Sequence, residues 1–508
     1  MKYKNLAKTS LQAMPRGRNF SDSLIRNKFV PNIKCLDEVL QKMKVPYEET
    51  VYQKGYRYGE GTALRLVRPK NTEQLSEILQ CCNSEGIGVV PQGGNSGLVG
   101  SSTADNSGKQ VVIGTDLLNK DIFQLEGNSL KVGAGFILDT VNQRLENEGM
   151  FLPIDIGASG SANIGGLIST NAAGSRAARY GNTKARTSEI TVVTANGEVK
   201  QIKTDMRAVD PELPQDNSKI DPNNPFIGSQ GYLGVIADAV MIVEQKPIRY
   251  ETVVLVPKNI EAISNIRQEL QNDFSDGLIA FEGMSGEALR LVGKNIQNTG
   301  YLFADEPQKV DYALLAEVAT KDENEDLDAM LYATLERLTD SKDVTTGLMG
   351  NSHLYWHHRH HISEAIKLEG QVIATDIAVR GADNLSAFRL EASEKLKNDF
   401  PDLMIVPFGH EALGAMHFNM VCPKEKELSP ALKKEIQTAV YELAVGKYKG
   451  TFSAEHGVGP HNAWAYDRFT ADSVKSQAEK LKRQYDPKDI MNPNLNYGFS
   501  KLKGLNVT

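Results

Sequence analysis

The sequence predicts an α+β fold divided into two or three domains. At 508 residues the chain is too long for a single hydrophobic core. Segments with strand-like alternation and segments with helical spacing follow one another in both halves of the chain. Between them, the block Pro153–Gly181 contains six glycines, each of which would cost roughly 0.5–1 kcal/mol relative to alanine inside a helix or strand. The block therefore predicts a long shaped loop within this fold.

Composition and charge exclude several classes of protein. The net charge of −7 and the lack of a long basic stripe argue against a nucleic-acid-binding protein. No apolar run approaches the 18 residues that a membrane span needs, so any membrane contact would be peripheral. Residues 1–20 carry five basic side chains and no acid, but no hydrophobic segment follows, so a secretory signal is not expected. We expect a cytoplasmic protein, with peripheral contact at an inner membrane left open, or a mitochondrial one in a eukaryote.

The four cysteines give no sign of a disulfide or metal framework. They are Cys35, Cys81, Cys82 and Cys422, and no CxxC pair occurs among them. Cys81 and Cys82 lie on a predicted helix, where they are interpreted as packing residues in a reducing compartment.

Residues 1–45 are predicted to be an N-terminal extension with one helix over residues 36–43. A strand then ends at Pro69, and Asn71 has the features of a helix N-cap, with Gln74 where a capping box closes. The helix stops at Gly86, and a further strand leads into the Gly93–Gly97 loop. Successive glycine amides in such a loop can form a concave nest for phosphate oxygens. Strand, helix, strand and loop together predict one α+β subdomain.

A second subdomain is predicted to follow. Residues 111–115 and 129–133 are interpreted as strands, and a helix after them is closed by Gly149. Asn196-Gly197 between two apolar runs predicts a β-hairpin. Residues 206–225 are polar and rich in Asp, Asn and Pro, which predicts a surface loop, and residues 226–243 return to strand character.

Pro247 marks a boundary to the second half of the chain. Residues 250–470 are predicted to form a substrate (cap) domain, an antiparallel sheet with helices on one face, and residues 471–508 to return to the first domain. The expected organisation is an extension (1–45), a two-subdomain domain (46–245), the substrate domain (250–470) and a C-terminal segment (471–508).

Three stretches carry a resemblance to a known family. They are residues 91–97, residues 155–161 continuing to Arg179-Tyr180-Gly181, and residues 227–234. They resemble the vanillyl-alcohol oxidase family of FAD-binding oxidoreductases, with a PCMH-type FAD domain of two α+β subdomains, and within it the D-2-hydroxy-acid dehydrogenase branch. The resemblance extends over residues 45–498. It implies a non-covalently held FAD, because relatives that tether the flavin commonly place a histidine where this chain has Asn95.

The resemblance also implies which residues contact the flavin. The segment that the family often has in the region of 206–225 is missing here. The implied contacts are Pro91, Gln92, Gly93, Gly94, Asn95, Ser96, Gly97, Leu98, Asp155, Gly157, Ala158, Ser161, Ile164, Gly165, Gly166, Asn171, Ala172, Gly174, Arg179, Tyr180, Gly181, Gly231, Gly234, Val235, Ile236 and Asn492.

All nine histidines lie between residues 353 and 461. His410 and His417 are predicted on a strand–turn–strand unit, and Glu455 supplies a carboxylate further on. Two imidazoles and a carboxylate with an open position form catalytic divalent-metal sites, although this spacing alone is more typical of two unrelated histidines. The resemblance implies that His410, His417 and Glu455 hold zinc or a similar ion. The apolar turn at residues 411–416 departs from the family's polar turn and removes partners that tune metal affinity.

Three further residues are candidates for catalysis. His456 suits the removal of a hydroxyl proton, since histidine titrates near neutral pH; the alternative is a metal ligand or packing group. The resemblance implies that Arg359 grips the substrate carboxylate, which an arginine fork matches in geometry, and Asn419 completes the catalytic set. Where the resemblance implies a lysine in a 2-hydroxyglutarate dehydrogenase, this chain has Ala374, which favours a monocarboxylate or a bulkier, less acidic side chain, while His360 and His361 leave some recognition of an acidic group open.

The leading hypothesis is an FAD-dependent dehydrogenase that oxidises a D-lactate-like D-2-hydroxy acid to the 2-oxo acid, passing hydride to flavin N5. The electron acceptor would be a quinone, a cytochrome or an electron-transfer flavoprotein. The protein could also form a homodimer. One alternative is an FAD-binding accessory subunit without its own activity. Another is the transferase branch that makes alkyl-glycerone-phosphate, against which Glu455 argues. No GxGxxG follows a strand, so no NAD site is expected.

Overall fold

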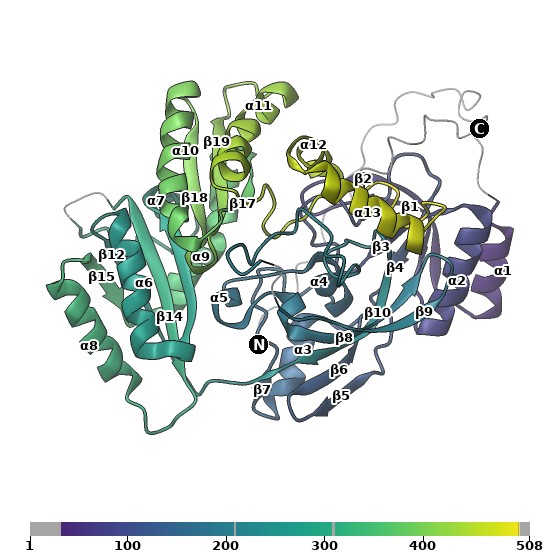
Figure 1. The fold of residues 1–508 in the computed structure, drawn as a ribbon, viewed down its shortest axis with the longest axis horizontal. Helices are drawn as coiled ribbons and strands as arrows, with labels where there is room; N and C mark the ends of the chain where they lie inside the picture. Colours follow the sequence, from purple (N-terminus) through teal and green to yellow (C-terminus); the bar gives the residue numbers. More distant parts are fainter. Residues whose placement is uncertain (1–31, 208–209, 307–309, 496, 498–508) are drawn as a thin grey trace.

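The computed structural model describes residues 32–207, 210–306, 310–495 and 497. Figure 1 shows the N-terminal half and the following green half side by side, with the yellow C-terminal helices lying back against the N-terminal half. The α+β fold class is confirmed. Residues 1–31 of the predicted extension and residues 498–508 of the predicted C-terminal segment lie outside the described residues.

The first sheet is mixed. It has the order β1 (Tyr47–Lys54), β2 (Glu60–Val67), β4 (Gln110–Gly114), β3 (Gly88–Gln92), and is covered by α1 (Lys34–Lys42) and α2 (Thr72–Glu85). The predicted N-cap is confirmed: the Asn71 side chain accepts from the Gln74 amide at 2.9 Å, and the Gln74 side chain accepts from the Lys70 amide at 2.7 Å. Gly86 ends α2 at φ 67°, where a residue without a side chain is favoured.

The second sheet is antiparallel. Its order is β5 (Phe123–Glu126), β6 (Ser129–Gly133), β10 (Gly234–Ile242), β8 (Thr187–Thr194), β9 (Val199–Lys203). The Asn196-Gly197 hairpin is confirmed between β8 and β9. The strand predicted over 226–243 begins only at Gly234, because the chain turns at Gly228, Gln230 and Gly231, which all have positive φ. The helices of this unit are α3 (Leu138–Glu146), α4 (Ile164–Thr170) and α5 (Ala177–Tyr180).

The polar segment 210–225 is more than a surface loop, which corrects the prediction for residues 206–225. Asn217 is 4% exposed, and its amide group donates to the carbonyls of Thr170 at 3.0 Å and Glu455 at 2.7 Å. Polar side chains enter an interior when they satisfy backbone groups there, and composition alone does not reveal this. The segment therefore ties the glycine block to the distal half of the chain.

The distal half contains an eight-stranded antiparallel sheet. Its order is β15 (Val344–Met349), β12 (Arg249–Pro257), β14 (Tyr312–Thr320), β13 (Leu278–Ser285), β18 (Met404–His410), β19 (Ala415–Pro423), β16 (Gly370–Ile373), with β17 (Asp376–Ala378) also paired to β19. The antiparallel sheet was predicted.

The prediction that the helices cover one face of this sheet is wrong. Every residue of β13 and β14 is buried, so both faces need apolar cover. One face packs against α7 (Gly286–Asn295) and α9 (Ser352–Lys367). The other packs against α6 (Ile260–Phe274), α8 (Leu327–Asp340), α10 (Leu385–Asp399) and α11 (Pro430–Tyr441).

The C-terminal segment completes the first sheet. After α12 (Gly459–Phe469) and α13 (Asp472–Tyr485), the chain runs along β3. The Val89 amide donates to the Ile490 carbonyl and the Asn492 amide donates to the Val89 carbonyl, both at 2.7 Å. Among the described residues, no helix has the length and apolar character needed to cross a membrane.

The prediction that Cys81 is reduced is wrong, whereas Cys82 is free as predicted. Cys35 and Cys81 form a disulfide between α1 and α2, whereas Cys82 and Cys422 are free and buried. The two residues are 46 positions apart and 5.8 Å apart between Cα atoms, because α1 packs against α2. Sequence spacing carries no information about this contact.

Replacing Cys35 with serine is expected to lower the free energy of unfolding of the N-terminal half by roughly 2–4 kcal/mol, because the unfolded chain is no longer cross-linked. Thermal unfolding in oxidising buffer measures this. Reductant should destabilise the wild type by the same amount and leave Cys35→Ser unchanged. A reductant effect on the variant as large as that on the wild type would contradict the assignment.

Candidate functional site

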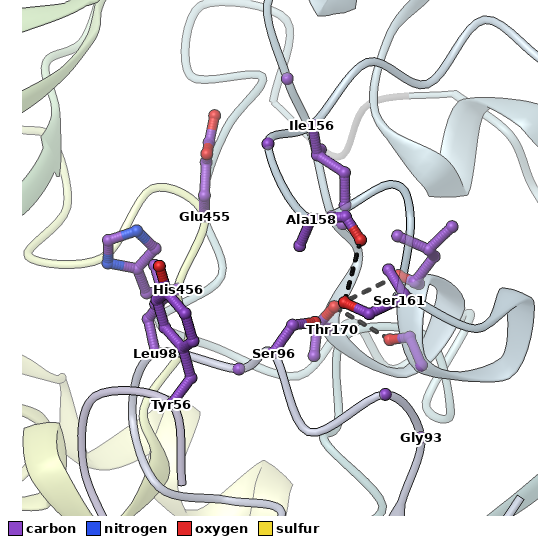
Figure 2. A pocket seen from close by; sticks show the side chains of 18 of the residues that line it. Tyr56, Gly93, Ser96, Leu98, Ile156, Ala158, Ser161, Thr170, Glu455 and His456 are labelled. Atoms are coloured by element: carbon purple, nitrogen blue, oxygen red, sulfur yellow. Dashed lines mark hydrogen bonds between the residues drawn. The ribbon is translucent and has the colours of Figure 1, made fainter. Parts of the chain in front are cut away.

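A cavity of about 1000 Å³ lies where the two halves of the molecule meet. The N-terminal half contributes the loop 91–98, the glycine block from Asp155 to Ser175, and residues 230–236. The distal half contributes residues of α9, β18 and β19 and the pair Glu455-His456. Figure 2 shows Glu455 and His456 on one side of this space and Ile156, Ala158 and Ser161 across from them.

The cavity brings together most of the residues that were predicted to contact a flavin. Those that line it are Pro91, Gln92, Gly93, Gly94, Asn95, Ser96, Gly97, Leu98, Asp155, Gly157, Ala158, Ser161, Gly165, Gly166, Ala172, Gly174, Gly231, Val235 and Ile236. The other predicted contacts lie outside the lining: Ile164, Asn171, Arg179, Tyr180, Gly181, Gly234 and Asn492.

These outlying residues have structural partners. Asn171 bonds to Asn217 at 3.0 Å, and Arg179 forms an ion pair with Asp276 at 2.6 Å. Tyr180 is buried against Phe151. The Asn492 side chain donates to the carbonyls of Ser101 and Gln230. Motif position alone does not separate residues that shape the loop from those that line it.

The glycines of the cavity wall leave room for a bound group. A Cβ atom added to Gly157 or Gly166 would meet no atom within 4 Å, so a side chain there would take up open space beside the backbone. At Gly94 a Cβ atom would lie 1.9 Å from the Ser161 carbonyl oxygen, so this loop packs directly on the glycine block. A bare backbone wall of this kind suits a flat or anionic ligand.

The hairpin of β18 and β19 places two histidines together, as the strand–turn–strand prediction required. The chain turns between the strands through Glu411–Leu413 and Gly414, which has φ 64°. The ring centroids of His410 and His417 lie 5.8 Å apart. One ligand atom each from His410, His417 and Glu455 lie within 4.8 Å of one another. The three predicted metal ligands therefore converge.

The pKa of His410 and the pKa of Glu455 each depend on the charge of the other residue. Burial alone would lower the pKa of His410, but the flanking carboxylates Glu282 and Glu455 outweigh it and raise the pKa to about 10. Burial opposes ionisation of Glu455, yet His410 lowers the pKa of this carboxyl well below its usual range. Glu455 Oε1 lies 2.9 Å from His410 Nε2, but it is buried without a hydrogen bond of good geometry. Two imidazoles and a carboxylate whose ligand atoms lie this close together are a donor set that suits a divalent metal.

Asp376 is a site residue that the sequence reasoning missed. Its Oδ2 atom accepts from the backbone amides of Glu455 at 2.9 Å and His456 at 2.7 Å. The Nδ1 atoms of His417 and His456 lie 3.7 and 3.6 Å from its carboxylate. Asp376, His417 and His456 form a second group that could hold a cation. An acid within the apolar run around Ile373–Val379 was the available signal.

Glu282 was also missed, although it lies at the centre of the charged cluster. Its Oε2 atom accepts from Arg359 Nε at 2.8 Å and lies 2.6 Å from Arg359 Nη2. Its Oε1 atom lies 2.7 Å from His410 Nδ1. Glu282 is 1% exposed and is the only charged residue of its strand, β13. One carboxylate therefore fixes both the predicted substrate arginine and a predicted metal ligand.

His456 lines the cavity beside this cluster. Its ring stacks on His417 with centroids 5.3 Å apart and an interplanar angle of 10°. Burial, with a smaller contribution from Arg57, lowers the pKa of His456 to about 4. The ring is therefore neutral at neutral pH and able to accept a proton. Asn419, on β19, also lines the cavity and is buried.

Several lining residues had not been predicted. From the N-terminal half these are Tyr56, Arg57, Thr115, Thr170 and Gln230, and from α9 they are His360, His361, Ser363, Glu364 and Lys367. The Gln230 side chain donates to the His456 carbonyl at 2.9 Å and accepts from the Gly459 amide at 3.0 Å. Their place in the lining depends on the meeting of two domains, which motif spacing does not reveal.

Comparisons with known proteins agree with this geometry. Residues 63–203 match the family model of an FAD binding domain, and residues 246–495 match that of the C-terminal domain of FAD linked oxidases. The chain is 31% identical over 445 residues to a mitochondrial D-2-hydroxyglutarate dehydrogenase of Danio rerio, covering 85% of this chain and 78% of the relative. It is 30% identical over 440 residues to the D-2-hydroxyglutarate dehydrogenase of Stutzerimonas stutzeri, covering 84% and 89%.

A solved structure of alkyldihydroxyacetonephosphate synthase shares the fold. Its TM-score is 0.65 at 17% identity, and the match covers 92% of this chain and 88% of that chain. Identity at this level supports the fold alone.

Proposed function

Since this chain belongs to the FAD-linked oxidases with a PCMH-type FAD domain, in their D-2-hydroxy-acid dehydrogenase branch, we propose that it oxidises a D-lactate-like D-2-hydroxy acid to the 2-oxo acid. The observation that carries the proposal is convergence: His456, Arg359 and the cluster of His410, His417 and Glu455 face the same cavity as the glycine loops. FAD, when bound along those loops, supplies the hydride acceptor.

His456 is proposed as the base that takes the hydroxyl proton. Its ring is neutral, lines the cavity, and is positioned by Asp376, which accepts from the His456 backbone amide. Removal of this proton as the hydride leaves the α-carbon is what a base near the reacting hydroxyl contributes. Stacking on His417 limits rotation of the ring.

Arg359 is proposed to bind the carboxylate of the substrate. Glu282 occupies its Nε and Nη2 atoms, so the donors left for a substrate are on the outer edge of the guanidinium group. Phe408 lies under the same group, 4.9 Å from the ring centroid to the guanidinium carbon. The arginine is thus held in one orientation before the substrate arrives, which reduces the entropy lost on binding.

We propose that His410, His417 and Glu455 hold a divalent metal, zinc being the ion expected for this donor set. A metal bound there would stabilise negative charge on the reacting hydroxyl oxygen. Glu282 accepts from His410 Nδ1, which leaves Nε2 directed to the cluster, as the partners of metal-binding histidines usually do.

The test is a panel of D- and L-2-hydroxy acids with purified, FAD-loaded protein. Flavin bleaching by a D-acid but not by its L-enantiomer is expected, with a large loss after treatment with a chelator and recovery on adding Zn²⁺. If no acid bleaches the flavin, an accessory subunit without its own activity becomes the better interpretation. Bleaching unaffected by chelation, with metal content below one ion per chain, would remove the metal from the proposal.

Electrons are proposed to leave for a quinone, a cytochrome or an electron-transfer flavoprotein, and a panel of acceptors distinguishes these. The transferase alternative has only the shared fold in its favour. Glu455, which the transferase branch replaces by histidine according to the resemblance, lies within the donor cluster here.

A further inference from the structure

Helix α9 carries five of the nine histidines of the chain, and they divide between its two faces. His358 is fully buried, and both of its ring nitrogens lie within 3.0 Å of backbone carbonyl oxygens. His353, His357 and His361 follow one another at four-residue spacing, and each of them is exposed or half-buried. Because residues four apart lie on the same face of a helix, these three side chains form a row along the outer face of α9.

The rings of this row lie close to one another. The ring centroids of His357 and His361 are 4.0 Å apart, and those of His353 and His357 are 6.2 Å apart. Two histidines at positions i and i+4 on one helix face are also the arrangement with which helical zinc motifs bind their ion. His357 and His361 therefore have the spacing of a chelating pair, which His353 extends by one turn.

The hydrogen bonds of the pair leave one unprotonated nitrogen on each neutral ring. His361 Nδ1 lies 2.8 Å from the His357 carbonyl oxygen. A carbonyl oxygen can only accept, so Nδ1 carries the proton and Nε2 has the lone pair. His357 Nε2 lies 3.0 Å from the Thr299 hydroxyl, which donates its own proton to the Gln297 carbonyl. The hydroxyl therefore accepts from Nε2, which leaves the lone pair of His357 on Nδ1.

The surroundings of the pair favour a bound cation. Burial and the neighbouring histidines lower the pKa of His357, so its ring is neutral at neutral pH, which is the form that binds a metal. The carboxylate of Glu364, three residues after His361, acts on the pKa of His357 in the opposite direction, so it lies near enough to attract a cation. The ammonium group of Lys367, one turn beyond, lies 5.4 Å from the centroid of the Tyr56 ring.

The pair is separate from the cluster of His410, His417 and Glu455. Two residues of that cluster lie on β18 and β19 and the third lies in the segment before α12, so none of them belongs to α9. His357 does not line the cavity, whereas His361 does. A metal held by the pair would therefore lie at the border of the cavity and share no ligand with the cluster.

We propose that His357 and His361 form a second metal site of this protein, on the outer face of α9, and that it binds a transition-metal dication such as Zn²⁺ or Ni²⁺ through one imidazole nitrogen of each ring. Imidazole suits these ions, whereas Mg²⁺ and Ca²⁺ prefer oxygen ligands and should not compete for the site. The inference goes beyond the proposed function and does not depend on it, because neither histidine has a role there.

The test counts the Zn²⁺ ions bound by the full-length, FAD-loaded protein after its metals have been removed, by competition with a chromophoric chelator. His357→Gln should bind one Zn²⁺ fewer than the wild type. His417→Gln, which removes a ligand of the other cluster, should retain the ion on α9, and the double variant should bind none. In the His417→Gln background, His357→Gln should lower the affinity for Ni²⁺ about 10²-fold, because a single imidazole lacks the effective concentration that linking two of them provides.

His360→Gln is the matched control, because it removes an exposed histidine of the same helix whose ring stacks on Trp356 and not on the row. It should bind as many Zn²⁺ ions as the wild type, with the same affinity for Ni²⁺. Circular dichroism of the variants should match that of the wild type, since His357 and His360 are not buried.

Equal Zn²⁺ content in the wild type and His357→Gln would overturn the proposal. The same loss of Ni²⁺ affinity in His360→Gln as in His357→Gln would also overturn it, because the ion would then bind to scattered surface histidines. If His417→Gln binds as much Zn²⁺ as the wild type while His357→Gln binds less, the site on α9 is supported and the metal of the proposed function fails, so the two failures are distinguishable.

Discussion

His456→Gln is expected to lower the rate of flavin reduction by a D-2-hydroxy acid by roughly 10²–10⁴-fold, the usual contribution of a general base. Glutamine keeps a polar side chain of similar reach but cannot accept a proton. The wild-type ring is neutral because burial lowers the pKa of His456 to about 4. Stopped-flow absorbance of the flavin measures the effect, and substrate dissociation should change little.

His461→Gln provides the matched control for this experiment. His461 is another histidine near Arg57, and burial lowers its pKa to about 3, but it stacks on Tyr58 and does not line the cavity. Its replacement should leave the chemical step near the wild-type rate. Rapid flavin reduction by His456→Gln would assign the base to another group, of which the stacked His417 is the nearest candidate.

Glu282→Gln is expected to reduce kcat/KM by roughly 10²–10³-fold, because removing one member of a buried charge cluster costs about 3–5 kcal/mol where the remaining charges cannot be satisfied. Arg359 and His410 both lose their charged partner. Zn²⁺ affinity, measured by competition with a chelator, should fall about 10–100-fold, as is typical for partners of metal-binding histidines.

Glu411→Gln is the control for Glu282→Gln. Glu411 is equally buried and lies close by, but it accepts from the Tyr312 hydroxyl and touches neither Arg359 nor a metal ligand by hydrogen bond. Burial raises the pKa of the Glu411 carboxyl, so replacing it with an uncharged glutamine should change activity and Zn²⁺ affinity little. If the two variants had the same activity and the same Zn²⁺ affinity, Glu282 would have no role beyond packing.

Local signals in the sequence predicted the local structure well. Asn71 caps its helix, Asn196-Gly197 forms its hairpin, and the glycine block lines a cavity, because each depends on a few neighbouring residues. His410 and His417 could be placed together for the same reason, since a hairpin brings its two strand ends into contact.

Contacts between residues far apart in the sequence could not be predicted from these local signals. Glu282 lies 128 positions from His410, and only the order of strands in the sheet brings them together. The Cys35–Cys81 bond and the second layer of helices depend in the same way on how elements pack. Arg57 joins the cavity only because a turn of one domain meets the other domain.

The pairing of β3 with residues 490–492 constrains the order in which the N-terminal half can be completed. Val89 is bonded on both its amide and carbonyl sides to residues 490 and 492, and β3 leads directly into the loop that begins at Gly93. A nascent chain lacks this partner until residues 490 and 492 have left the ribosome. The strand that leads into the glycine-rich loop therefore gains its last hydrogen bonds only after residues 490 and 492 have been synthesised.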